Sequence, residues 1–163
     1  MMGPFRLDVE PGGLFTSSME SRLCLARRYF ASGGVALAMA KIGSVGWMDL
    51  TVPNADAVRD FYKEVVGWTS SGCDMGGYED YVMSQPEGEI ATSGICHARG
   101  PNVGVPPQWL MYINVSSLEA SVEAVIRLGG KLIKRGGGPG AGGFFAVIQD
   151  PAGAVCALFE PSS

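Results

Sequence analysis

The run VGWMDLTVPNADAVRDFYKEVVGW, residues 45–68, contains the pattern of a strand, a turn and a helix in direct succession. Val45–Val52 is apolar with β-branched residues, which is typical of a strand. Asn54 offers an N-cap, and apolar residues then recur at helical spacing over Ala55–Val66. Gly67 stands where a glycine commonly ends a helix. We therefore predict a strand followed at once by an amphipathic helix.

Three short strand-like runs follow this helix, and the whole order then occurs a second time. The predicted strands of the first half are 68–73, 78–84 and 90–98. In the second half, a strand over 109–115 and a helix over 118–128 precede strands over 131–134, 144–149 and 154–159. Val115 and Gly130 follow Val52 and Gly67 by the same 63 positions, which indicates an internal repeat. The predicted fold class is α+β: two βαβββ modules forming a cup-shaped eight-stranded mixed sheet with the helices outside.

The domain organisation follows from this repeat. We expect one domain over residues 42–161, with module one at 42–99, a glycine- and proline-rich linker, and module two at 107–161. Residues 1–41 show no clear period and are predicted to be an N-terminal extension. Three interpretations of it stay open: a targeting peptide, a segment that packs on the domain or a partner, and an upstream read-through before Met39. Acidic residues within it favour an extension without chemistry over targeting.

Composition excludes several classes of partner. The net charge is −4 and no cluster of Lys and Arg marks a basic face, so we expect no nucleic acid. No apolar run approaches the roughly 18–20 residues that cross a bilayer, so we expect no membrane association. Cys96 and Cys156 lie in apolar strand-like runs, where buried free thiols are expected, and a cytoplasmic location fits this usage best.

Two groups of residues resemble a known family. Asp49–Pro53, Phe61-Tyr62 and Val66–Trp68 are similar to the first module of vicinal-oxygen-chelate proteins, the glyoxalase/bleomycin-resistance/dioxygenase superfamily. Asp150–Gly153 resembles the turn before their last strand. The resemblance covers about three quarters of the chain, and it implies a small-molecule pocket between the modules and a homodimer. It is weak for activity, because proteins of one fold catalyse different reactions.

Metal-dependent members of this superfamily take ligands from the first and last strands of each module. Carried onto this chain, those positions hold Trp47 and Leu110 on the first strands, Ala157 on the last strand, and a residue near Gly94. None of these side chains can coordinate a divalent ion. We therefore expect no metal and no cofactor.

The first strand also provides candidates for binding and catalysis. Trp47 and Asp49 lie two residues apart, so they share one face of the sheet. The 63-residue offset places Tyr112 opposite Asp49, which predicts a carboxylate and a phenol facing the pocket. His97 is the natural acid/base candidate because its ordinary pKa lies near neutrality, although a histidine at a strand end is more often a surface residue.

Aromatic side chains on the strands are expected to complete the pocket. The residues predicted to bind ligand are Trp47, Asp49, Tyr78, Trp109, Tyr112, Phe144 and Gln149. Gly136–Gly143 is interpreted as a mobile loop at the rim of the pocket. Met48 and Met111, equivalent by the offset, are expected in the core under the helices.

Three hypotheses about function remain. The favoured one is a metal-independent protein that binds an aromatic or cationic small molecule. The second is an enzyme, a glyoxalase-like lyase or isomerase or a dioxygenase with a non-standard site, using Asp49, His97 or Tyr112. The third is a dimerising scaffold module.

Overall fold

The computed structural model describes residues 41–162 apart from 88–89 and 139–141. The predicted N-terminal extension therefore lies outside the described residues, except for Lys41. No helix in the described part of the chain is long and apolar enough to cross a membrane.

Module one consists of β1 (Val45–Val52), α2 (Ala55–Val66), β2 (Thr69–Asp74), β3 (Glu79–Ser84) and β4 (Ala91–His97). The Asn54 side chain accepts a hydrogen bond from the Ala57 amide at 3.1 Å and so caps α2, as the sequence predicts. Gly67 ends the helix in the left-handed region, with φ 77°. Both ends of α2 are therefore determined by residues of the opening run.

Module two repeats the order after the short 3-10 helix η2 (Gly100–Asn102). It contains β5 (Trp109–Asn114), α3 (Leu118–Arg127), β6 (Lys131–Gly138), β7 (Gly143–Gln149) and β8 (Val155–Pro161). The Ser117 hydroxyl accepts from the Ala120 amide at 3.3 Å, at the position that Asn54 occupies in module one. The predicted internal repeat is confirmed for all five elements.

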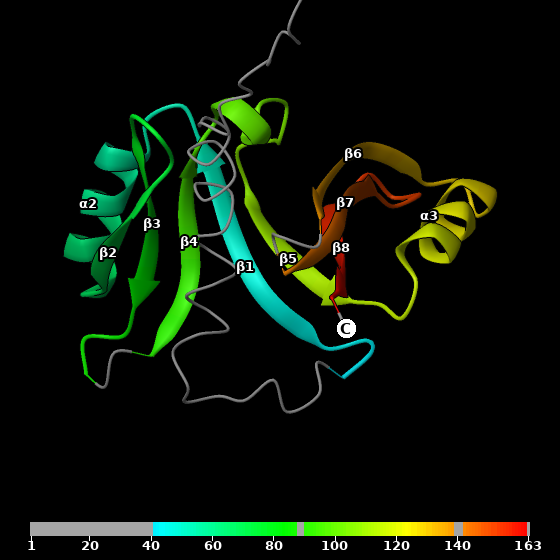
Figure 1. The fold of residues 1–163 in the computed structure, drawn as a ribbon, viewed down its shortest axis with the longest axis horizontal. Helices are drawn as coiled ribbons and strands as arrows, with labels where there is room; N and C mark the ends of the chain where they lie inside the picture. Colours follow the sequence, from blue (N-terminus) through cyan, green and yellow to red (C-terminus); the bar gives the residue numbers. More distant parts are fainter. Residues whose placement is uncertain (1–40, 88–89, 139–141, 163) are drawn as a thin grey trace, which may run out of the picture.

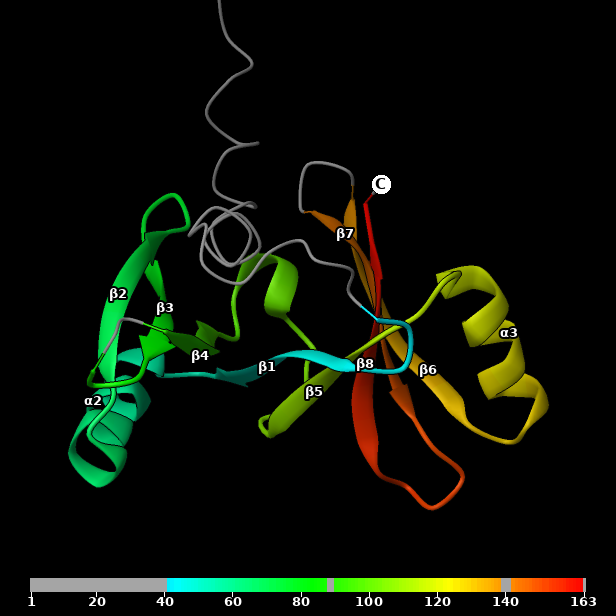
Figure 2. The same cartoon turned by 90° about the horizontal axis from the view of Figure 1, so that it is seen from below.

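The two modules join into one eight-stranded sheet, in the order β2-β3-β4-β1-β5-β8-β7-β6. β1 pairs in parallel with β4, and β5 with β8, whereas β1 and β5 are antiparallel neighbours at the centre. Figures 1 and 2 show α2 and α3 at opposite ends of this curved sheet. The mixed sheet with its two outer helices confirms the predicted fold class.

Both helices pack on the same face of the sheet. Under α2, Ala55 contacts Tyr81, Met83 and Ile95 of β3 and β4. A second cluster under α3 contains Leu118, Val122, Ala146, Ile148 and Leu158. We call this the helix face, and the opposite side of the sheet the inner face. Strand residues therefore alternate between the two faces.

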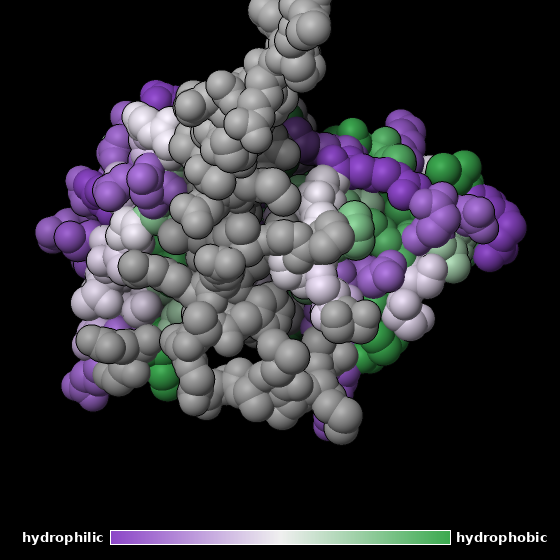
Figure 3. All heavy atoms as spheres, in the orientation of Figure 1, coloured by the Kyte–Doolittle hydropathy of each residue, from purple (hydrophilic) through white to green (hydrophobic). Residues whose placement is uncertain are grey.

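Between the helices, the helix face is less covered than predicted. Met48 and Met111 pair across β1 and β5 but are 37% and 46% exposed, so the expectation that they form core is wrong. The two helices lie toward opposite ends of the sheet (Figure 1) and leave this part of the central strands uncovered. In Figure 3, apolar surface is visible over module two, whereas the surface of module one is largely polar.

The described residues of the glycine-rich segment 136–143 are mostly strand. β6 continues to Gly138 and β7 begins at Gly143, which corrects the prediction of a loop over Gly136–Gly143. A Cβ atom at Gly136 would lie 2.4 Å from the ring of Phe145, its cross-strand partner. Glycine thus lets this ring lie across the neighbouring strand. The part of the predicted loop at 139–141 lies outside the described residues.

Candidate functional site

The inner face of the central strands carries the predicted carboxylate. In the ladder between β1 and β5, Trp47 pairs with Tyr112 and Asp49 with Leu110. Asp49 also lies beside Gly94 of the parallel strand β4. Four strands of both modules therefore contribute to this region, since Ala157 of β8 pairs with Tyr112 on the other side.

Asp49 is held by donors from three strands. The indole Nε1 of Trp47 donates to Asp49 Oδ1 at 2.6 Å, and the Tyr112 hydroxyl and the Gly94 backbone amide are further donors. Burial raises the pKa of Asp49 to about 6, and the hydrogen bonds from Trp47 and Tyr112 oppose part of that rise. The carboxylate therefore changes charge close to neutral pH. The predicted contact between Asp49 and Tyr112 is present.

Aromatic rings surround this carboxylate. Burial and the nearby Asp49 charge raise the pKa of Tyr112 well above its ordinary value, so the phenol stays a hydrogen-bond donor. Its ring meets that of Phe145 edge to face, with centroids 5.9 Å apart. We call Trp47, Asp49, Tyr112 and Phe145 the inner-face site. It combines one carboxylate with three aromatic surfaces, a chemistry suited to flat or cationic molecules.

The positions at which the resemblance places metal ligands do not fit a metal. Trp47 donates its only nitrogen–hydrogen group to Asp49, and Leu110, Gly94 and Ala157 have no coordinating atoms in their side chains. Among the residues that the structure describes, no three His, Cys, Asp or Glu side chains group as metal ligands.

Two of the predicted ligand-binding aromatics lie elsewhere. Trp109 packs under α2 against Tyr62 and Trp68, and its Nε1 donates to the Tyr62 hydroxyl at 2.9 Å. Phe144 is 44% exposed and shares the helix face with Ala146. Both expectations are corrected for the same reason. Each residue neighbours an inner-face residue in the sequence, Leu110 or Phe145, and strand alternation turns it to the other side.

Tyr78 and Gln149 also lie apart from Asp49. Tyr78 precedes β3, and its ring meets the imidazole of His97 with centroids 5.5 Å apart. Gln149 ends β7, and its side-chain amide donates to the carbonyl of Gly153 at 3.1 Å. Gln149 thus stabilises the hairpin that carries the Asp150–Gly153 turn.

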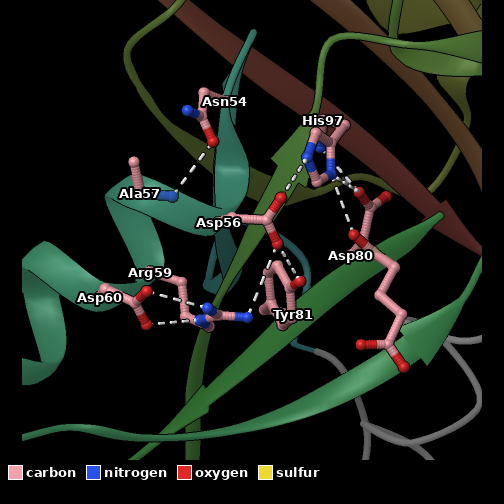
Figure 4. Close-up of polar contacts among 9 residues, drawn as sticks. Asn54, Asp56, Ala57, Arg59, Asp60, Asp80, Tyr81 and His97 are labelled. Atoms are coloured by element: carbon pink, nitrogen blue, oxygen red, sulfur yellow. Dashed lines mark hydrogen bonds and ion pairs between the residues drawn. The ribbon is translucent and has the colours of Figure 1, made fainter.

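His97 is buried, which corrects the expectation of a surface histidine at the end of its strand. It is only 3% exposed and lies between two carboxylates (Figure 4). Its Nε2 is 3.4 Å from Asp56 Oδ2 of α2, and its Nδ1 is 3.4 Å from Asp80 Oδ1 of β3. Nδ1 also contacts the backbone carbonyl of Glu79 at 2.9 Å.

Asp80 and Cys96 are site residues that the sequence reasoning missed. Asp80 is fully buried, accepts the His97 backbone amide at 2.7 Å and is hydrogen-bonded to the Cys96 thiol. Burial raises the pKa of both Asp80 and Cys96. The available signal is the position of Asp80 directly before the apolar residues Tyr81–Met83 of a predicted strand, because a charge buried there requires partners.

At the surface end of this cluster, Asp56 is shared between three neighbours. The Tyr81 hydroxyl donates to Asp56, and Arg59 lies 3.6 Å from the same carboxylate. The guanidinium of Arg59 also lies 4.3 Å from the centroid of the Tyr81 ring (Figure 4). The hydrogen bond from Tyr81, with smaller contributions from His97 and Arg59, lowers the pKa of Asp56.

A duplicated βαβββ sheet with an inner-face site defines the class of protein. The glyoxalase-like domain model matches residues 47–159, and the chain belongs to this family. It is 30% identical over 119 residues to the "Putative glyoxylase CFP32" of Mycobacterium tuberculosis, covering 72% of this chain and 46% of that protein. It is 28% identical over 129 residues to the anthracycline biosynthesis protein DnrV of Streptomyces peucetius, covering 72% and 47%.

The chain thus spans about half the length of these curated relatives. Among solved structures, glyoxalase I from Zea mays matches with a TM-score of 0.51 and 17% identity, over 75% of this chain and 44% of that one. At that identity the match supports the fold and not the activity.

Proposed function

We propose that the chain is a metal-independent small-molecule-binding protein that holds an aromatic or cationic ligand at the inner-face site. The observation that carries this proposal is the half-buried Asp49 carboxylate, held by Trp47 and Tyr112 beside the ring of Phe145. A cation beside Asp49 would offset the cost of keeping that carboxylate ionised. Flat rings would stack on the surrounding aromatic side chains.

The relatives are compatible with such a ligand. One is named for anthracycline biosynthesis, and anthracyclines are flat polycyclic aromatic compounds that carry an amino sugar. We propose the same chemical class, a fused aromatic system with a cationic group, for this chain. The expected homodimer and cytoplasmic location stay predictions, the first to be checked by light scattering.

The test uses proflavine, a flat aromatic cation, and follows binding by its fluorescence. We expect Asp49→Asn and Phe145→Leu to weaken binding at least tenfold, because each removes part of the inner-face site. Phe144→Leu is the matched control: the same change, one residue away, on the helix face. Equal losses in Phe144→Leu and Phe145→Leu, or unchanged affinity in Asp49→Asn, would refute the proposal.

One observation favours a second function, that of a lyase or isomerase. A carboxylate with a pKa of about 6 beside a phenol that stays protonated is a suitable base and acid pair. Such an enzyme would exchange a carbon-bound proton of an α-hydroxy or α-thio carbonyl compound with deuterated water. The exchange should persist in EDTA and be lost in Asp49→Asn; loss in EDTA alone would indicate a metal instead.

A further inference from the structure

A line of titratable side chains connects the surface of α2 with the inner-face site. It runs from Asp56 through His97 to Asp80, with two gaps of 3.4 Å, and continues to Cys96 by a hydrogen bond. Cys96 lies on the inner face of β4, two residues beyond Gly94, which pairs with Asp49. The line therefore ends close to Asp49, the carboxylate on which the proposed function depends, and interacts with it electrostatically.

Asp80 is a second buried carboxyl group of module one, and its charge raises the pKa of Asp49. β3 pairs Val82 with Gly94, and alternation places Asp80 on the same inner face as Asp49. Its donors are the His97 backbone amide at 2.7 Å, the Asn102 side chain at 3.4 Å and the Cys96 thiol. These donors are neutral, so they do not cancel its charge. An uncancelled anion here makes ionisation of Asp49 less favourable, since like charges repel strongly in a poorly solvated region.

His97 is placed to cancel that charge. Each of its ring nitrogens faces oxygen atoms that can only accept: Nδ1 faces Asp80 and the Glu79 carbonyl, and Nε2 faces Asp56. A neutral imidazole has one N–H group and satisfies one side, whereas the imidazolium satisfies both. Both ring nitrogens therefore face acceptors, and the side chain is placed to donate to Asp80 and to Asp56.

The other charged or titratable groups around His97 and Asp80 come from every element packed on them. Around the pair stand Asp56 and Arg59 of α2, Tyr78 and Tyr81 of the β3 segment, Cys96 of β4, and Arg99 over the Tyr78 ring. Arg59 is engaged with Asp60 and Asp56. His97 is therefore the basic side chain in direct contact with Asp80 among the described residues.

We propose that Asp80 and His97 are positioning residues that control the charge of Asp49 through this line, Asp80 opposing its ionisation and His97 relieving that opposition. This inference rests on the proposed function at one point: that Asp49 is the group that binds the ligand. The line reaches solvent at the exposed Asp56, so it connects the surface of α2 with the charge on the inner face.

The test needs no ligand. The indole N–H of Trp47 donates to Asp49, so its 15N–1H cross-peak reports the charge of that carboxylate as pH changes. Only three tryptophans occur in the chain, and Trp47→Phe assigns the peak. We expect the titration midpoint to fall by about 0.5–1 pH unit in Asp80→Asn and to rise by a similar amount in His97→Gln, a size typical of charges in a protein that interact without touching.

Opposite shifts are the decisive result, because a general structural disturbance would not move the two variants in opposite directions. Asp60→Asn, which alters the same cluster only at its exposed ion pair with Arg59, should leave the midpoint unchanged. If Asp80→Asn does not fold, His97→Gln decides alone. An unchanged midpoint in His97→Gln, or a shift of both variants in one direction, would overturn the proposal. Proflavine binding without this pattern of shifts would refute only this inference, and the pattern without proflavine binding would refute only the proposed function.

Discussion

The charge on Asp49 should make the stability of the protein depend on pH in a way that one substitution removes. Burial raises the pKa of this carboxyl from 3.8 to about 6 in the folded chain. The folded state therefore binds the proton more tightly than the unfolded state does. Below about pH 3 the group is largely protonated in both states and carries little cost. Between pH 4 and 6 the cost of ionising it in the folded state appears, and above about pH 7 it is complete.

The size of this cost follows from the shift. About two pH units, at roughly 1.4 kcal/mol each, give at most about 3 kcal/mol. Asp49→Asn retains an oxygen that can accept from Trp47 or Tyr112, but it has no charge to ionise. Relative to the wild type, the variant should therefore gain up to about 3 kcal/mol in the free energy of unfolding between pH 4 and pH 7.5.

Urea unfolding followed by circular dichroism, at low protein concentration and at intervals from pH 4 to pH 8, measures this difference. Asp60→Asn is the control, because Arg59 lowers the pKa of Asp60, so that the group stays ionised in both states between pH 5 and 8. Its difference from the wild type should be flat in that range. If the difference for Asp49→Asn changes by less than about 0.5 kcal/mol across the whole range, Asp49 does not carry a raised pKa and the charge assignment fails.

Four further results are expected. Tyr112→Phe removes a donor that stabilises ionised Asp49, so the Trp47 indole peak should titrate at higher pH; a lower midpoint would contradict this. Leu110→Ala, at a fully buried position of the central strands, should cost about 2–5 kcal/mol in urea unfolding. Asn54→Ala removes the α2 cap and should cost about 1 kcal/mol by the same assay. Gly137→Ala should lower Tm clearly, because Gly137 has φ 86° and a Cβ atom would lie 2.3 Å from the Gly143 carbonyl oxygen.

The sequence predicts the architecture well because each element carries a local signal at both ends. Asn54 and Gly67 delimit α2, and the same signals recur 63 residues later, so an error in one module is checked against the other. The exception is the segment after α3. Glycines in a row are typical of a loop, but in the folded chain those at 136–138 continue the strand β6. Gly136 makes room for the ring of Phe145, and this tertiary requirement leaves no local signal in the sequence.

The candidate site is predicted only where strand alternation and the repeat apply together. Both place Trp47, Asp49 and Tyr112 on one face, and the structure brings them together. Where the limits of a strand are known only approximately, an error of one residue in its alignment assigns every side chain to the wrong face of the sheet. For this reason the sequence predicts Phe144 as a ligand-binding residue, whereas its neighbour Phe145 lies on the inner face. The neighbours of His97 escape prediction for another reason: Asp56, Asp80 and His97 lie on different elements, and no periodicity relates them.

The raised pKa of Asp49 is consistent with the side chains at the positions where the family resemblance places metal ligands. A divalent cation beside a carboxylate favours the ionised form and lowers its pKa, whereas burial among neutral donors raises it. Trp47 stands at a position where the family resemblance places a ligand, and its indole donates one neutral hydrogen bond to the carboxylate two residues along the strand. Burial raises the pKa of Asp49 to about 6, and the neutral hydrogen bonds offset only part of that rise because they do not cancel the charge. The cost of that uncancelled charge is what a cationic ligand would relieve, and it is also what makes the distant pair of Asp80 and His97 able to influence the site.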